Sequence, residues 1–154
     1  MSLTVDQVKK MFAPLADPAT QKQFVEHIDE NVECVTSPKP AHACSWTIAG
    51  PNAKQAPFGQ YHSRKDFLEK ALGPVGAAFE GGIALVIEHE PIVTGDRALV
   101  ELRAADKHGK TPTGKNGTVF DNRYAWVVTI RDDKIVQARA YLDTRLVLEL
   151  LDRL

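Results

Sequence analysis

The stretch TVFDNRYAWVVTIR, residues 118–131, decides how the rest of the chain is interpreted. Side chains of a β-strand alternate between its two faces, so the stretch predicts a strand with an apolar inner face and a charged outer face. The inner face holds the even positions, which are Phe120, Asn122, Tyr124, Trp126, Val128 and Ile130. Asn122 interrupts this apolar stripe. A buried amide without a hydrogen-bond partner costs about 1–3 kcal/mol, so a side chain, a ligand or water must satisfy it.

A second strand, Ile135–Leu142, follows a tight turn at residues 132–134. Its even face includes the small residues Ala138 and Ala140, which either form the floor of a cavity or allow a helix to pack closely. A closing helix follows, with Asp143 at the N-cap position and leucine and valine at helical spacing.

The composition is that of an ordinary globular chain, which we expect to form one domain over residues 1–154. Apolar residues make up 44% of it, charged residues 25%, and the net charge is −1. This balance gives no electrostatic signature of nucleic acid or of an anionic membrane as a partner. We find no signal peptide and no membrane-spanning run, so we expect a cytoplasmic location, with Cys34 and Cys44 as reduced thiols.

The order of elements predicts an α+β fold, in which helices cover one face of a mostly antiparallel sheet. A capping box at Thr4–Gln7 predicts the start of the first helix. A second helix is expected from Asp17 to about Asn31. A third is expected to begin at Ser63 and to end or kink at Gly73-Pro74. Strands are expected at Ala43–Ala49, Ile83–Thr94 and Ala98–Ala104, with a hairpin turn at Gly95-Asp96 and a mobile loop at Lys107–Gly117.

Most of the chain resembles a known family, most strongly from residue 83 onward. Residues 121–126 (DNRYAW), the turn residues 133–135 and residues 139–143 (RAYLD) are similar to the signature of SnoaL-like proteins, within the nuclear transport factor 2-like (NTF2-like) superfamily that includes ketosteroid isomerases. The resemblance implies a cone-shaped, strongly bent sheet around an apolar pocket, closed by helices. It also implies a homodimer formed through the outer face of the sheet. The fold hosts enzymes and non-catalytic modules alike.

The acids used by two of the superfamily's activities are missing. Isomerases of this type have an aspartate where this chain reads Ser45–Ala49, and a second acid in the strand that here reads Tyr124-Ala125-Trp126. Epoxide hydrolases of this type have an aspartate at the position of Ala140. The resemblance therefore does not extend to these named mechanisms.

Three residues are candidates for acid–base chemistry. Tyr124 can donate a proton or hydrogen bond to a carbonyl oxygen, and Asn122 can hold an enolate or orient water. The alternative is that these two bond to each other or to buried water. Glu101 is a general base if it faces the cavity, because burial would raise its pKa. If it faces solvent, it pairs with Arg103 or another charge.

Five residues are candidates for contacting a substrate. Trp46 and Trp126 offer ring surfaces to a planar ligand, although core packing explains them as well. His62 flanks a loop that can cover a cavity mouth, and Ala138 and Ala140 provide its floor. No metal is expected, because histidines 27, 42, 62, 89 and 108 lack ligand spacing, and no motif indicates a cofactor.

The sequence favours a cofactor-independent isomerase, cyclase or dehydratase acting on a small, mostly apolar metabolite. In this hypothesis Tyr124 and Asn122 polarise an oxygen, and Glu101 or a histidine moves the proton. The alternative is a non-catalytic module of the same fold that binds a small molecule or dimerises.

Overall fold

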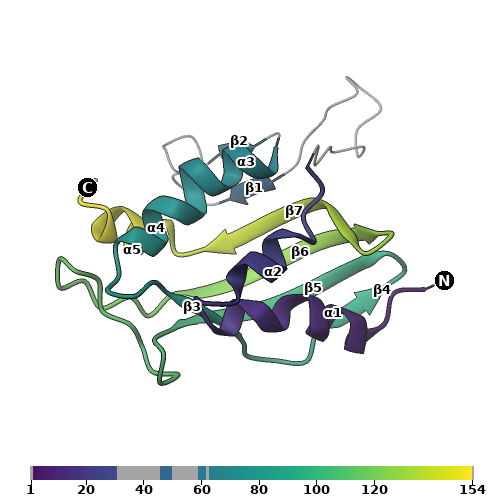
Figure 1. The fold of residues 1–154 in the computed structure, drawn as a ribbon, viewed down its shortest axis with the longest axis horizontal. Helices are drawn as coiled ribbons and strands as arrows, with labels where there is room; N and C mark the ends of the chain where they lie inside the picture. The colour runs from purple at the N-terminus through teal and green to yellow at the C-terminus, as the bar shows by residue number, and fades with distance from the viewer. Residues whose placement is uncertain (1, 31–45, 50–58, 62, 154) are drawn as a thin grey trace.

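The computed structural model describes residues 2–30, 46–49, 59–61 and 63–153. It contains a seven-stranded, mostly antiparallel sheet (Figure 1). Its strands are β1 (Trp46–Ala49), β2 (Gly59–Tyr61), β3 (Ala84–Ile87), β4 (Ile92–Thr94), β5 (Arg97–Ala105), β6 (Arg123–Arg131) and β7 (Lys134–Leu142). They pair in the order β2-β1-β7-β6-β5-β3, with β4 also on β5, and among these described strands only the β1–β7 pair is parallel.

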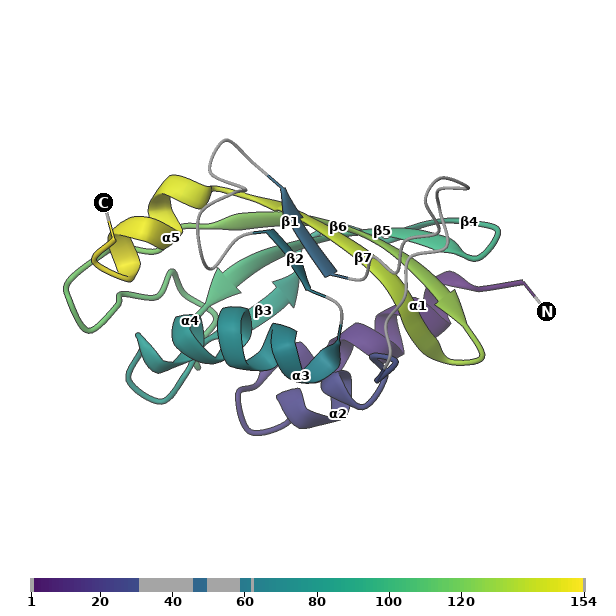
Figure 2. The same ribbon diagram turned by 90° about the horizontal axis from the view of Figure 1, so that it is seen from above.

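The helical segments lie mainly on one side of this curved sheet. They are α1 (Val5–Phe12), η1 (Ala13–Ala16), α2 (Gln21–Val25), α3 (Arg64–Phe67), η2 (Leu68–Leu72), α4 (Gly73–Ala77) and α5 (Thr144–Leu150). Figure 2 shows α1 to α4 covering one face, while α5 lies at one end of the sheet. The α+β architecture predicted from the sequence is confirmed. Within the described residues, no helix is long and apolar enough to cross a membrane.

The first helix forms as its capping box predicts. The Thr4 hydroxyl accepts from the Gln7 N–H at 3.2 Å, and the Gln7 side chain accepts from the Thr4 N–H at 2.8 Å. The second helix is much shorter than predicted. It ends at Val25, because the following residues turn to make a bridge between Ile28 and Ile135.

The third helix does not stop at Gly73-Pro74. Instead α3, η2 and α4 run on as one helix, whose middle section η2 has π-helical geometry. Proline has no N–H to close an ordinary helical turn, and a π-turn just before it accommodates that loss. Gly73 allows the backbone at this position to lie close to Leu68, since a Cβ at residue 73 would be only 2.8 Å from the Leu68 carbonyl oxygen.

Several strand boundaries differ from the predictions. The strand expected from Thr118 begins at Arg123, and the one expected over Ile83–Thr94 is split by residues 88–91. Pro91 lies in this interruption and cannot donate to the ladder. Both hairpin turns are confirmed, with positive φ at Gly95 and at the pair Asp132 and Asp133.

The even face of residues 120–130 is the inner face, as predicted. Phe120, Asn122, Trp126, Val128 and Ile130 are at most 5% exposed, and Tyr124 is half-buried. Trp126 packs against Phe12 and Phe24 with ring centroids 5.8 Å from each. These contacts join the sheet to α1 and α2.

Candidate functional site

Asn122 is fully buried, and its amide is satisfied by the backbone of Asp143. Its Nδ2 donates to the Asp143 carbonyl at 3.2 Å, and its Oδ1 accepts from the Asp143 N–H at 3.0 Å. Neither a ligand nor water is needed to satisfy this amide. The structure therefore corrects the prediction of a catalytic Asn122 and gives it a structural role, joining β6 to the start of α5.

Tyr124 is the inner-face residue of β6 that keeps accessible surface. Asn122 and Trp126, its neighbours on that face, are 0% and 3% exposed, whereas Tyr124 and its cross-strand partner Leu142 are half-buried. Desolvation by burial raises the pKa of the Tyr124 phenol well above its usual value of 10. No described residue forms a hydrogen bond with its hydroxyl. This phenol is thus a neutral donor at physiological pH.

The other inner-face candidates are core residues. Trp126 is enclosed by Phe12 and Phe24, and Ala138 and Ala140 are 1% and 4% exposed. The side chains of Ala138 and Ala140 are covered, which agrees with the alternative that small residues here allow another layer to pack closely on the sheet. We therefore correct the prediction that these three residues contact a substrate.

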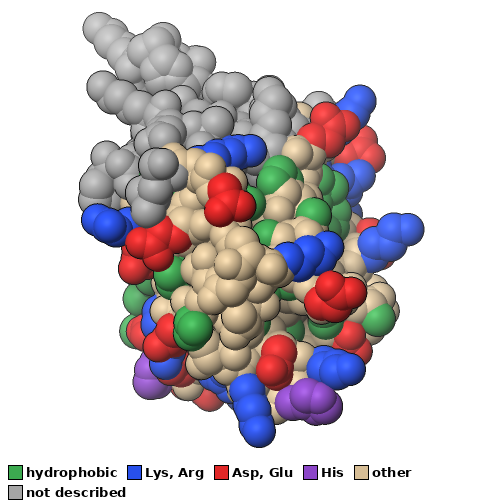
Figure 3. Space-filling model, turned by 90° about the vertical axis from the view of Figure 1, so that its left-hand side faces the viewer, with side chains coloured by type: hydrophobic (Ala, Val, Ile, Leu, Met, Phe, Trp, Pro, Cys, Tyr) green, Lys and Arg blue, Asp and Glu red, His purple; other side chains and the backbone are tan. Residues whose placement is uncertain are grey.

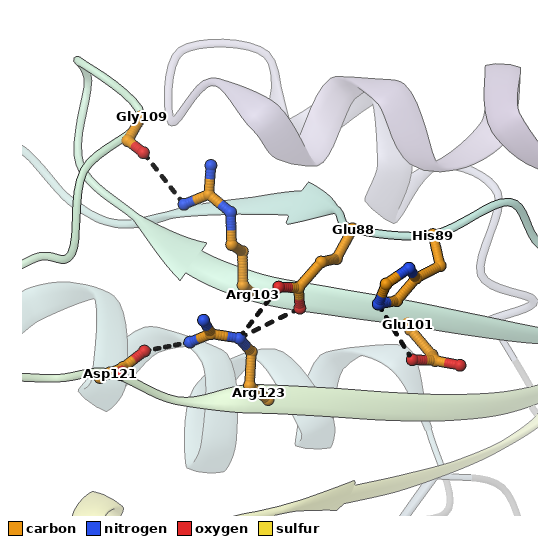
Figure 4. A network of polar contacts seen from close by, with 7 residues as sticks. All are labelled: Glu88, His89, Glu101, Arg103, Gly109, Asp121 and Arg123. Atoms are coloured by element: carbon orange, nitrogen blue, oxygen red, sulfur yellow. Dashed lines mark hydrogen bonds and ion pairs between the residues drawn. The ribbon is translucent and has the colours of Figure 1, made fainter.

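Glu101 lies on the outer face of β5, because the even positions of that strand are the buried ones. Its side chain is 46% exposed, and its carboxylate is 3.8 Å from Nε2 of His89 (Figure 4). A neighbouring network of ion pairs joins Arg123 to Glu88, at 3.1 Å, and to Asp121. The prediction that Glu101 is an inward-facing general base is therefore wrong, and its solvent-facing alternative holds.

The remaining candidates are only partly located. The backbone of Trp46 pairs with Ala138 in the parallel β1–β7 ladder. His62 lies outside the described residues. His27 Nδ1 is 3.1 Å from the Asp133 carbonyl oxygen, and no group of three or more His, Cys, Asp or Glu side chains in the described part could hold a metal ion.

Sequence reasoning missed a surface groove of about 670 Å³ beside the N-terminal end of α1. It is lined by Leu3 and Gln7 on one side and by the two hairpin turns, with Asp96 and Asp133, on the other. Ile130 lies at its base, at the opposite end of β6 from Tyr124. The groove is therefore separate from the inner-face site.

On the face shown in Figure 3, positive and negative side chains of the described residues are interspersed, with small hydrophobic areas between them. This agrees with the near-zero net charge of −1.

No family model matches the chain, and no curated protein matches it. Solved structures do share its fold. TerC, co-crystallised with polyporic acid, is 19% identical with a TM-score of 0.66, covering 96% of this chain and 97% of that chain. An NTF2-like protein from Burkholderia thailandensis is 19% identical with a TM-score of 0.66 and 98% coverage of both chains. A protein with a cystatin-like fold from Xanthomonas campestris is 15% identical, with a TM-score of 0.68, covering 97% of this chain and 98% of that one.

These similarities show the fold alone. The chain has an NTF2-like fold, as the family resemblance in its sequence implied.

Proposed function

We propose that the chain binds a small, mostly apolar molecule at Tyr124 and Leu142, where the inner face of the sheet keeps accessible surface, with the Tyr124 hydroxyl donating a hydrogen bond to an oxygen of the ligand. The observation that carries this proposal is the environment of Tyr124. Its phenol is desolvated, has no hydrogen-bond partner among the described residues, and retains accessible surface beside Leu142. A largely desolvated hydroxyl that has no protein partner gains a hydrogen bond when a ligand supplies an acceptor.

Binding is favoured over catalysis by the positions of the other candidates. Glu101 is on the outer face, and Asn122 is engaged by Asp143. Isomerisation, cyclisation or dehydration would need a base beside Tyr124 in addition, and with Glu101 on the outer face the sequence offers a histidine for that role. TerC, a protein of the same fold, was crystallised with polyporic acid, which makes an aromatic ligand a reasonable first probe.

The test compares two probes of matched shape. Methyl naphthyl ketone carries an acceptor oxygen, and ethylnaphthalene does not. We expect the wild-type chain to prefer the ketone, and Tyr124→Phe to lose that preference by roughly fivefold to tenfold, the value of one net hydrogen bond. Glu101→Gln is the matched control and should change nothing. Equal affinity of both chains for both probes would refute the proposal, and polyporic acid extends the test to a larger ligand.

We also propose that two copies of the chain associate through the outer face of the sheet. The helices α1 to α4 leave this face uncovered (Figure 2). It presents Tyr141, which is 43% exposed, together with the half-buried Leu99, Ala125 and Val127. The charged network of Figure 4 borders this apolar strip, as polar rims border interfaces.

A further inference from the structure

Two asparagines from one segment hold the two ends of α5. At the beginning of the helix, Asn122 bonds both the N–H and the carbonyl of Asp143. At its end, Asn116 Nδ2 donates to the carbonyls of Glu149 and Leu150 and to Asp152 Oδ1, at 3.0 to 3.1 Å. The Asn116 Oδ1 in turn accepts from the Thr118 N–H at 3.0 Å. The loop expected to be mobile is therefore fastened to α5 here.

The helix depends on these contacts for its order. With seven residues, α5 is too short to be stable alone. Its terminal backbone groups need partners: the Asp143 side chain accepts from the Leu146 N–H, and Asn116 donates to the carbonyls of Glu149 and Leu150. Its apolar side chains Val147, Leu148 and Leu150 are buried in the core.

The two attachments differ in their exposure to water. Asn122 is fully buried, so water cannot replace its bonds to Asp143. Asn116 is exposed, and water competes for its bonds to Glu149 and Asp152. Exposed hydrogen bonds of this kind open first in local unfolding. The helix therefore has a firm attachment at its beginning and a releasable one at its end.

The firm end adjoins the proposed ligand site. Asn122 lies two residues before Tyr124 on the same face of the sheet, and Leu142, opposite Tyr124, directly precedes Asp143. Leu146, in the first turn of α5, packs half-buried against the core. The beginning of α5 is therefore adjacent to Tyr124 in the strand register.

We propose that α5 is a gate to the Tyr124 site, hinged at the Asn122–Asp143 pair and latched at its far end by Asn116. The opening of α5 is inferred from the contacts described above. Its role as a gate depends in addition on the proposed ligand site at Tyr124. When the Asn116 bonds break, the end of α5 leaves the Gly114 surface. Leu150 packs so closely on this surface that a Cβ at Gly114 would overlap Leu150 Cδ1.

Hydrogen exchange of α5 tests the opening without a ligand. We expect Asn116→Ala to speed exchange of the amides of residues 147–151 by about tenfold, while amides of β5 and β6 keep their rates. Lys115→Ala is the matched control, because its exposed side chain makes no hydrogen bond or ion pair with a described residue. Equal acceleration of α5 and β6 amides by Asn116→Ala would overturn the proposal, since α5 would then open only with the whole fold.

Stopped-flow binding of the fluorescent probe N-phenylnaphthylamine tests the gating. Asn116→Ala should speed entry and exit together and leave the equilibrium constant within twofold. Unchanged entry and exit rates, or a change in only one of the two, would refute the gate alone. If neither this probe nor the naphthyl ketone binds to any variant, the ligand site is refuted, and with it the gating role. The hydrogen-exchange result would still decide whether α5 opens locally.

Discussion

The Asn122 side chain continues the β6–β7 ladder beyond its last inner-face backbone pair, Tyr124 and Leu142. Its amide bonds the N–H and the carbonyl of Asp143 at 3.0 and 3.2 Å, as a neighbouring strand would. Asp143 uses its own side chain to accept from the Leu146 N–H at 3.0 Å and so caps α5. One amide therefore fixes the change from strand to helix.

Replacing this amide should destabilise the whole fold. Asn122→Ala leaves the Asp143 N–H unpaired and removes one of the two donors to the Asp143 carbonyl, which keeps only the Val147 N–H at 3.4 Å. We expect a loss of about 2–4 kcal/mol of unfolding free energy. Urea titration followed by circular dichroism measures it. Asp121→Ala, a change at the exposed preceding residue, is the control and should have little effect. A loss under about 0.5 kcal/mol for Asn122→Ala would contradict the structural role.

Tyr124→Phe should leave stability at neutral pH unchanged or slightly higher, because it removes a hydroxyl without a partner among the described residues. The pH dependence gives the second part of this prediction. The folded-state pKa of Tyr124 is raised, so the unfolded chain loses its proton first as the pH rises through about 10.

Above that pH the wild-type chain should lose up to about 1.4 kcal/mol of stability per pH unit from this group, since the folded state alone retains the proton. Tyr124→Phe lacks this contribution. The difference between the thermal unfolding curves of the wild-type chain and Tyr124→Phe at pH 9 to 11 isolates the contribution of the phenol from those of other titrating groups. Parallel losses in both chains would show that the phenol is solvated.

Two glycines three residues apart should respond in opposite directions to alanine. Gly76 lies in α4, and no atom lies within 4 Å of the position that a Cβ would take there, so Gly76→Ala should stabilise by about 0.5–1 kcal/mol. At Gly73 the same change places a Cβ 2.8 Å from the Leu68 carbonyl oxygen and should destabilise. Thermal unfolding compares them, and an equal gain at both positions would argue against the π-turn.

The proposed dimer gives a further prediction. Val127 is half-buried on the outer face between Leu99 and Arg139 in the strand register. A charge at the centre of an apolar interface is costly, so Val127→Lys should yield a monomer by light scattering at concentrations where the wild-type chain is a dimer. Lys115→Ala, at the end of the molecule near α5, is the control. A monomeric wild-type chain would refute the interface.

The sequence pattern predicted those features that depend on neighbours along the chain. The alternation from Phe120 to Ile130, the capping box at Thr4, the N-cap at Asp143 and both hairpin turns all form. Features set by distant contacts were missed. The β-bulge near Thr129 turns Ile135 inward, where its N–H donates to the His27 carbonyl and its side chain is fully buried.

The candidate site was harder to predict than the fold for the same reason. Alternation shows that Glu101 shares a face with Leu99 and Arg103 but not which face is covered. Asn122 was correctly identified as a buried amide that needs a partner, yet its partner is 21 residues away and belongs to the backbone. Only the three-dimensional pairing of β6 and β7 brings the two together.

The parallel pairing of β1 with β7 has a consequence for how the protein is made. Trp46–Ala49 pairs with residues 138–141, which the ribosome adds long after it. The pair of strands β1 and β2 must therefore wait, without its partner strand, until residues 138–141 have been synthesised. Nascent chains that stop before β7 should consequently remain sensitive to protease and rely on chaperones.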